Sequence, residues 1–215
     1  DEFPELIHGV MNLLWPHYLR PVPAMSLLEF TPIPGAITER KRIPARETEV
    51  ESREMEGTRC RFRTTADVDL YPLQLEQVSM ESASSGQSAL RLRFATLPGA
   101  TLGQAGIERL RLHLVGEPAY TLYYWLCRYV GKIKLRLLTQ GRPAEELGLP
   151  DCKIQPFGFA KEEALLPYPQ TAFDGYRLLQ EYFAFPQKFL AVDLSDLRPL
   201  ARRSSATTFE ILILF

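Results

Sequence analysis

The chain has 215 residues, 46% of them hydrophobic, and a formal net charge of -1 at pH 7. This composition excludes wholesale disorder, because it allows a sizeable core, and the small net charge gives no general attraction for nucleic acid or anionic lipid. Arginine outnumbers lysine by 19 to 6, which favours contacts with other proteins, although codon usage would produce the same excess.

The three cysteines, Cys60, Cys127 and Cys152, lie far apart and form no C-x-x-C pair. We therefore expect reduced thiols in a cytoplasmic protein, with neither a disulfide framework nor a zinc site. The most apolar run, "YTLYYWLCRYVGKIKLRLL", contains four basic residues, so we expect no insertion into a membrane. The chain begins without methionine and stops within "FEILILF", which suggests a fragment truncated at its C-terminus.

The first predicted element is a helix within "FPELIHGVMNLLWPHYL", where Leu6, Val10 and Leu13 recur at helical spacing until a proline ends the pattern. A proline-stiffened connector, "RPVPAM", follows. Residues 1–25 therefore form one predicted segment. Residues 26–215 form a β-rich mixed domain, which we expect to begin with a strand at "SLLEF".

Three later stretches, "TRCRFRT", "ALRLRFA" and "RLRLHLV", alternate apolar and basic residues. Alternation with a period of two is typical of antiparallel strands that bury one face. If the three strands are neighbours, their arginines form a single basic face. These arginines are Arg59, Arg61, Arg63, Arg91, Arg93, Arg109 and Arg111.

Three interpretations of this basic face remain open. The plainest is a solvated face, and the second is a docking surface for an acidic protein. The third, binding of RNA or DNA, is disfavoured because these strands lack interleaved exposed aromatic residues, so we expect no nucleic-acid partner. The glutamates that would balance a solvated face are Glu47, Glu49, Glu51 and Glu54.

The second half of the chain begins with a predicted helix in "GEPAYTLYYWLCRYVG", which starts near its proline and is capped by Gly131. The alternation in "KIKLRLL" predicts a strand, and "AEELG" is interpreted as one helical turn. "TFEILILF" supplies a last strand.

The stretch "FDGYRLLQEYFAFPQKFLAVDL" holds six aromatic residues among 22. Thr171 and Asp174 have capping-box-like spacing, and the pattern predicts a helix from about Asp174 to Phe183, followed by a strand in "KFLAVDL". Apolar residues on two sides of this helix predict burial between two layers. We interpret the segment as a structural aromatic joint formed by Phe173, Tyr176, Tyr182, Phe183, Phe185 and Phe189.

Motifs for catalysis or cofactor binding are not visible, because the sequence contains no H-E-x-x-H, G-x-S-x-G, phosphate loop or dinucleotide fingerprint. We therefore predict no catalytic residue, no cofactor and no metal ion. Carboxylate pairs such as Asp67 and Asp69 are assigned to turns and caps. An alternative hypothesis is a pocket lined by Tyr168, Phe173 and Tyr176. Such a pocket would belong to a hydrolase or to a ligand- or carbohydrate-binding module.

Together, these elements predict an α+β fold. We expect an antiparallel, β-rich domain with two sandwich-like layers, two principal helices and a further N-terminal helix.

Two stretches, "DEFPELIHGVMNLLWPHYLRPVPAM" and "ALLPYPQTAFDGYRLLQEYFAFPQKFLAVDL", closely resemble the TssF family, also called VasA or ImpG. Between them, "GTRCRFRTTADVDLYPLQL" is similar to the pattern of the same family, and the order and spacing agree over essentially the whole chain. "RIPARETEVES" is similar to a strand of the family, but Arg46 and Glu47 stand where a glycine is expected.

The resemblance implies a non-enzymatic component of the baseplate of the bacterial type VI secretion system, within a protein longer than this chain. It also implies a cytoplasmic location, next to a secretion apparatus anchored in the inner membrane. In this family, two TssF copies and one TssG form a wedge; wedges surround the VgrG spike, recruit TssE and TssK, and support assembly of the sheath. The implied partners are therefore TssG, TssK, TssE, VgrG and a second TssF copy.

Overall fold

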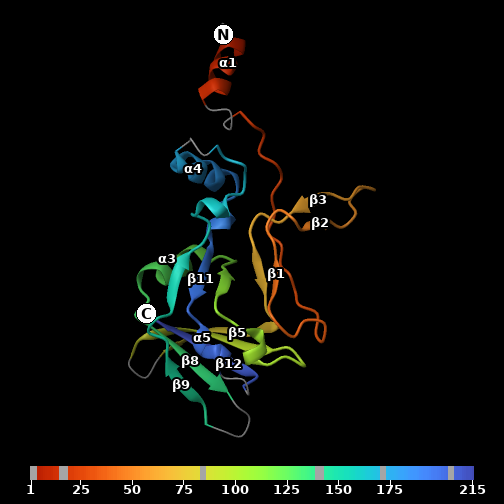
Figure 1. The fold of residues 1–215 in the computed structure, drawn as a ribbon. Helices are drawn as coiled ribbons and strands as arrows, with labels where there is room; N and C mark the ends of the chain where they lie inside the picture. Colours follow the sequence, from red (N-terminus) through yellow and green to blue (C-terminus); the bar gives the residue numbers. More distant parts are fainter. Residues whose placement is uncertain (1–3, 15–18, 83–85, 139–142, 170–172, 203–205) are drawn as a thin grey trace.

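The computed structural model describes six stretches of the chain, residues 4–14, 19–82, 86–138, 143–169, 173–202 and 206–215. Most of the chain forms two β-layers with a helical unit at one end, and a β-ribbon runs along their side (Figure 1). The mixed α+β class and the antiparallel pairing predicted from the sequence are confirmed. The proposed division at residue 25 stays a prediction.

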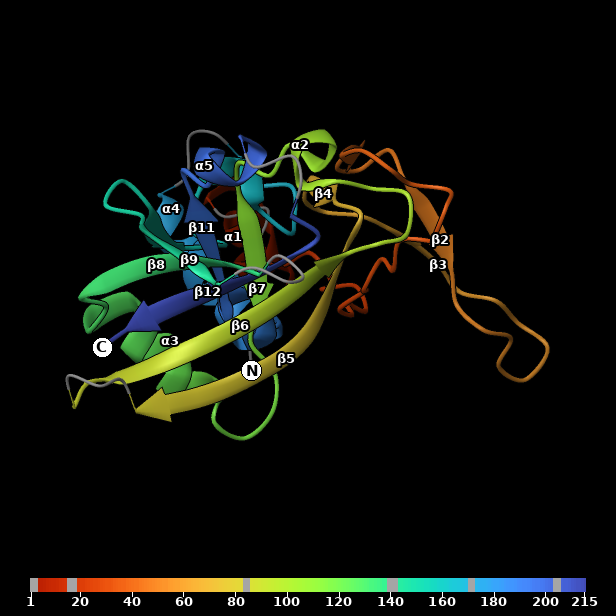
Figure 2. The ribbon, with the colours of Figure 1, turned by 90° about the horizontal axis from the view of Figure 1, so that it is seen from below.

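The first layer is a five-stranded antiparallel sheet, whose strands spread side by side in Figure 2. Its central strand, the last strand predicted in "TFEILILF", buries Phe209, Ile211 and Ile213 on one face and Leu212 and Leu214 on the other. Phe209 stacks on Phe94 of the neighbouring strand at 5.1 Å between ring centroids. In spatial order the strands are β5 (Leu73–Ser82), β6 (Ser88–Thr96), β12 (Thr208–Leu214), β8 (Lys132–Leu138) and β9 (Glu145–Gly148).

The second layer is a three-stranded antiparallel sheet with a helix beside it. Leu110, Val192 and Leu194 of this sheet belong to the same core cluster as the buried side chains of the first layer. Because successive side chains of a strand point to opposite faces, Arg111 and Asp193 lie on the face away from that core. The elements are β10 (Lys153–Pro156), β11 (Ala191–Ser195), β7 (Leu110–His113) and α3 (Ala119–Arg128).

Two short helices complete this core. Leu102, Ala105 and Leu200 from these helices are buried in the main cluster. A left-handed Gly106 follows the first of them as its C-cap, which suits a residue without a Cβ. The helices are α2 (Leu102–Ala105) and α5 (Arg198–Ala201), and they contact each other.

An N-terminal arm and a β-ribbon run along the side of the two layers in Figure 1. The arm begins with α1 (Pro4–Leu14), which buries none of its side chains against the rest of the described chain. The ribbon consists of two antiparallel pairs, β1 (Lys41–Ile43) with β4 (Val68–Leu70), and β2 (Glu49–Glu51) with β3 (Arg61–Arg63).

The turn in "RIPARETEVES" keeps a glycine-like backbone although its residue is arginine. Arg46 has a φ of 64°, in the left-handed region that favours glycine. Its backbone N–H donates to the Thr64 carbonyl at 2.6 Å, which ties the turn to the partner strand. The backbone conformation at this departure from the family pattern is therefore the one a glycine would supply.

The helical unit lies at the end of the molecule opposite the five-stranded sheet, with α1 beyond it in Figure 1. The predicted helix in this region is confirmed as α4 (Asp174–Ala184), although Thr171, its proposed cap, lies outside the described residues. Two 3₁₀ turns accompany it, η1 (Lys161–Glu163) and η2 (Pro186–Phe189).

Three local predictions are wrong. "SLLEF" is irregular and forms no strand. "AEELG" supplies β9 and not a helical turn, because it pairs with the edge of β8 and its Glu146 meets Arg136 across the pair at 2.7 Å. Helix α3 ends at Arg128 with Tyr129 as its C-cap, so Gly131 is no helix cap; instead the Gly131 N–H donates to the Leu214 carbonyl at the sheet end.

Candidate functional site

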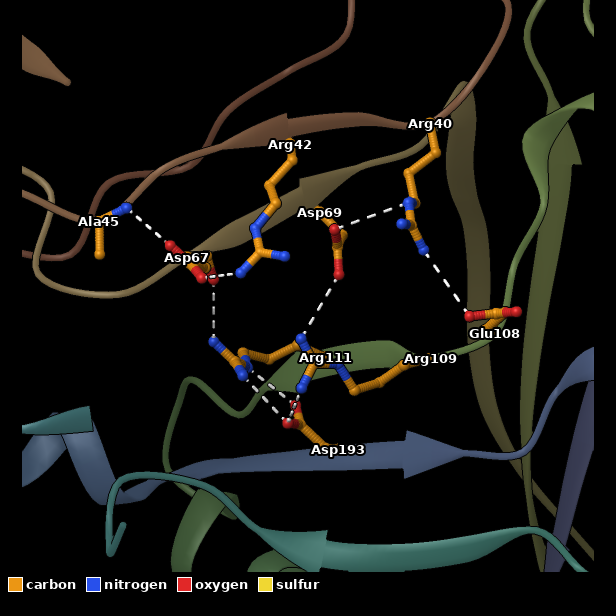
Figure 3. Close-up of polar contacts among 9 residues, drawn as sticks. All are labelled: Arg40, Arg42, Ala45, Asp67, Asp69, Glu108, Arg109, Arg111 and Asp193. Atoms are coloured by element: carbon orange, nitrogen blue, oxygen red, sulfur yellow. Dashed lines mark hydrogen bonds and ion pairs between the residues drawn. The ribbon is translucent and has the colours of Figure 1, made fainter. Parts of the chain in front are cut away.

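The ribbon meets the three-stranded sheet through a cluster of charged side chains, shown in Figure 3. The cluster contains four arginines and four carboxylates, contributed about equally by the two sides. We call it the charged joint. Its members are Arg40, Arg42, Asp67 and Asp69 from the ribbon side and Glu108, Arg109, Arg111 and Asp193 from the sheet side.

The centre of the charged joint is the pair formed by Arg111 and Asp193. The two residues stand opposite each other on β7 and β11, so their side chains share one face of the sheet. The Arg111 guanidinium donates to both carboxylate oxygens, at 2.8 and 3.0 Å, and it lies 3.5 Å above the centre of the Phe157 ring. This bidentate, stacked geometry is the one for which arginine is suited and lysine is not.

Asp67 connects the ribbon to that pair. Its carboxylate accepts a hydrogen bond from the Ala45 N–H at 2.7 Å and forms an ion pair with Arg42. Its backbone carbonyl accepts a hydrogen bond from the Arg111 guanidinium at 3.4 Å. The pKa of the Asp67 carboxyl is held below its usual range, mainly by the hydrogen bond from the Ala45 N–H and next by the hydrogen bond from Arg42.

Asp69 provides a second connection. Arg109 reaches its carboxylate at 3.4 Å and also lies 3.6 Å from Asp193. Arg40 lies 3.8 Å from both Asp69 and Glu108. Each charge in the joint thus faces an opposite charge, so the arrangement can fix the position of the ribbon but presents no activated nucleophile or free base.

A second charged cluster lies beneath α4. Arg177, Glu181 and Lys188 are 2%, 1% and 4% exposed, and we call them the buried triad. Glu181 accepts from Arg177 at 3.3 Å, from Lys188, and from the Leu165 N–H at 2.8 Å. Burial lowers the pKa of the Lys188 ammonium, against the opposing effect of Glu181.

The loop that covers the triad is also fixed by hydrogen bonds. Arg177 donates to the Phe159 carbonyl at 2.9 Å, and the Glu163 carboxylate accepts from the Gly158 N–H at 2.7 Å. Gly158 has a φ of 102°, and a Cβ there would lie 3.2 Å from the Lys188 side chain. A glycine is therefore required where the loop crosses Lys188.

The aromatic joint predicted from the sequence is wrong in its orientation. Phe173, Leu179, Tyr182 and Phe183 are 72%, 57%, 46% and 81% exposed, and Tyr176 is exposed beside Phe173. Only Phe189 is buried and Phe185 is half-buried. The ring spacing predicted the helix correctly, but the charged residues, not the rings, occupy its inner face.

The comparisons with known proteins agree over the whole chain. The family described as "Type VI secretion system, TssF" matches residues 1–215. The chain belongs to the TssF family. It is 32% identical to the "Type VI secretion system component TssF1" of Pseudomonas aeruginosa, with 100% of this chain and 37% of that protein covered.

A solved structure gives the same result for the fold. A chain in the cryo-electron microscopy structure of a TssK-TssF-TssG baseplate subcomplex of the type VI secretion system matches with a TM-score of 0.88 and 34% identity. The match covers 100% of this TssF-family chain and 40% of that chain. The present residues therefore span about two fifths of the length of these relatives.

The predicted single basic face is wrong, because the strands β3, β6 and β7 that carry or adjoin its arginines lie in three different sheets. Each of the seven also faces a carboxylate, as in the solvated interpretation. The pairs are Arg59 and Arg61 with Glu51, Arg63 with Glu49, Arg91 with Glu81, Arg93 with Glu76, Arg109 with Asp69, and Arg111 with Asp193.

In the alternative pocket, Phe173 contacts both of the other proposed lining residues. The Tyr168 hydroxyl donates to the Phe173 carbonyl at 3.0 Å, and Phe173 packs edge to face on Tyr176 at 5.8 Å. Two cavities among the described residues, one between α3 and β10 and one beside the charged joint, are not lined by these three residues.

Within the same described ranges, no group of three or more His, Cys, Asp or Glu residues could hold a metal ion. None of the described helices is long and apolar enough to cross a membrane.

Sequence reasoning missed most of the charged joint and all of the buried triad. Asp67 and Asp69 were recognised as a pair, but their arginine partners come from distant strands. Arg177 and Glu181 have the i, i+4 spacing of a helical ion pair, which is a signal that was available. That spacing does not reveal that Lys188 and a loop close over the pair.

Proposed function

We propose that this chain is a structural, non-enzymatic part of a TssF-type subunit of the type VI secretion baseplate. The observation that carries this proposal is the match of the whole chain to a chain solved within a TssK-TssF-TssG baseplate subcomplex. The proposed direct partners are TssG-type and TssK-type subunits. A wedge with TssG around the VgrG spike, contacts with TssE and a second TssF copy, and support of the sheath belong to the same proposal.

The charged joint and the buried triad support a mechanical role. The charged joint connects segments far apart in sequence, since Asp67 and Asp193 meet the same arginine, and the triad connects α4 to the preceding loop, since Glu181 accepts from Leu165. Charge-assisted hydrogen bonds are directional, so they hold segments at defined angles. A baseplate subunit needs such rigidity. The proposed location is the cytoplasmic side of the inner membrane, next to the secretion apparatus.

The test is co-expression of the chain with the TssG-type and TssK-type subunits of the same organism, followed by affinity purification and native mass measurement. We expect at least the TssG-type subunit to co-purify in a fixed stoichiometry. The Asp193→Asn variant should reduce the yield of complex, because it weakens the charged joint, whereas Glu162→Gln on the exposed η1 turn should not. A chain that folds but retains neither subunit would contradict the proposal.

A further inference from the structure

A cavity of about 710 Å³ lies between α3 and β10, within the range of about 300–1,000 Å³ that is usual for ligand sites. Three consecutive residues of β8, 132–134, and three of β10, 153–155, line it. Because successive side chains of a strand point to opposite faces of its sheet, a cavity lined by consecutive residues borders the backbone edge of the strand. The cavity therefore runs along the edges of two strands.

The edge of β10 that borders the cavity is unpaired. Strand β10 is an outer strand of the three-stranded sheet, so only its other edge pairs, with β11. The Phe157 N–H donates to the Ala191 carbonyl at 2.9 Å, and in this register Gln155 and Lys153 also direct their backbone groups to β11. The N–H and C=O of Ile154 therefore point to the free edge, where no backbone group of the described chain pairs with them. Such an edge can accept an added strand.

The cavity is also strongly basic, although the whole chain has a net charge of -1. Four cationic side chains line it, and its described lining contains no aspartate or glutamate. Lys134 lies 3.6 Å from Glu146, whereas the other three form no ion pair with a carboxylate in the described ranges. A complementary ligand is therefore acidic. The four cationic residues are Arg128, Lys132, Lys134 and Lys153.

Apolar side chains form the floor of the cavity between these charges. Leu126, Ile133 and Leu149 line it and are buried members of the main core cluster, so the floor is already in place before a ligand binds. An extended peptide points alternate side chains to opposite sides. A peptide that alternates apolar and acidic residues can therefore place its apolar side chains on the floor and its carboxylates beside the basic rim.

We propose that this cavity binds an extended acidic segment of a partner protein, which adds as a fourth strand to the free edge of β10. The backbone of the segment pairs with the N–H and C=O of Ile154, and its carboxylates meet Lys132 and Lys153. Pro156 has no N–H to donate, so the pairing is limited to the part of β10 before it. The inference goes beyond the proposed function and does not rest on it, because that function assigns no partner to this surface.

The experiment measures fluorescence anisotropy of a short fluorescein-labelled peptide of alternating valine and aspartate, titrated with the chain. We expect saturable binding that weakens as salt is added. Lys153→Glu should raise the dissociation constant at least about ten-fold, because it replaces an attractive charge at the cavity with a repulsive one. The matched control, Lys41→Glu, changes an exposed lysine of β1 outside the cavity and should leave the constant unchanged.

Two further measurements test the added strand itself. The same peptide with N-methyl groups on alternate amides keeps its carboxylates but loses backbone donors, so its dissociation constant should be at least about ten-fold higher. Amide hydrogen exchange at Ile154 should slow when the unmodified peptide binds, because its N–H then donates to the peptide backbone. Circular dichroism of each variant confirms that the fold is intact.

Four results would overturn the proposal. The first is a lack of saturable binding, and the second is equal binding of a peptide that alternates valine and lysine. The third is equal binding of the N-methylated peptide with unchanged exchange at Ile154, which would show only a general attraction of anions. The fourth is binding to the chain but not to a TssF-type subunit of full family length that contains it, since the cavity would then be filled by the subunit itself.

Failure of this inference can be distinguished from failure of the proposed function. If the chain co-purifies with the TssG-type subunit but does not bind the acidic peptide, this inference is wrong and the proposed function stands. If the peptide binds as expected but neither the TssG-type nor the TssK-type subunit co-purifies, the proposed function fails and this inference stands.

Discussion

The two ends of the molecule use opposite arrangements of the same side chains. In the β-layers, Phe209 is completely buried, and Arg136 stays partly exposed beside the buried Glu210. In the α4 unit, Phe183 is largely exposed, and an arginine, a lysine and a glutamate are buried. The comparison teaches that apolar spacing defines where a helix forms, whereas the partners of its charged residues decide which face points inward.

The largest expected difference in the free energy of unfolding is between the same substitution, Phe→Ala, made at the two ends of the molecule. Phe209→Ala should reduce the free energy of unfolding by about 3–5 kcal/mol, because it removes a fully buried ring that stacks on Phe94. Phe183→Ala should change it by less than about 0.5 kcal/mol, because that side chain already contacts solvent. Urea denaturation of the two variants measures both values. Equal losses would show that the α4 rings are part of a core after all.

The next prediction concerns the buried triad. Glu181→Ala leaves Arg177 and Lys188 buried without their shared carboxylate, and breaking a buried ion pair in this way typically costs about 3–5 kcal/mol. We expect a loss of that size in the free energy of unfolding, measured as for the Phe variants. Glu162→Ala, on the exposed η1 turn, is the matched control and should have almost no effect.

Replacing all three residues of the buried triad tests whether charge pairing among them holds α4 in place. Exchanging Arg177, Glu181 and Lys188 together for apolar residues of similar volume should restore most of the stability, since apolar substitutes for buried ion pairs are often neutral or stabilising. If the triple variant is as unstable as Glu181→Ala, then the hydrogen bonds to Phe159 and Leu165, and not charge pairing, hold α4 in place.

The smallest expected effect is the acid response of the charged joint. The pKa of Asp67 is lowered in the folded chain, so its contribution to stability is present above the unfolded value of about 3.9 and is lost as the pH falls below it. The Ala45 amide resonance in NMR spectra should report this titration, with a midpoint below about 3.9. Asp67→Asn should abolish the titration at Ala45, and a midpoint above the usual aspartate range would contradict the assignment.

The strands that could be predicted from the sequence are those in which burial makes apolar residues recur at a regular spacing. The alternation in "ALRLRFA" and "KIKLRLL" corresponds to β6 and β8, because each of these strands buries one face in the core. The apolar run in "TFEILILF" corresponds to β12, which is buried on both faces. The neighbours of each strand could not be predicted, since alternation carries no information about pairing. For that reason Arg61, Arg91 and Arg111 were placed on one face although they lie in separate sheets.

The two clusters were less predictable for a related reason. The contacts of the charged joint join residues such as Asp67 and Arg111, which are 44 positions apart, and only the packing of the ribbon on the sheet brings them together. For α4, the apolar spacing on two sides predicts burial between two layers, because burying apolar side chains is usually favourable. The triad reverses that preference by supplying charge-assisted hydrogen bonds inside.

The position of β12 has a consequence for how the chain is made. This strand lies between β6 and β8, yet it follows both in sequence by many residues. During synthesis from the N-terminus, the edges of β6 and β8 that pair with β12 therefore stay without their hydrogen-bond partner until residues 208–214 have left the ribosome. Such exposed edges invite pairing with other nascent chains. Slow translation upstream of residue 208, or a bound chaperone, should therefore influence the yield of folded protein more than the stability of the finished sheet does.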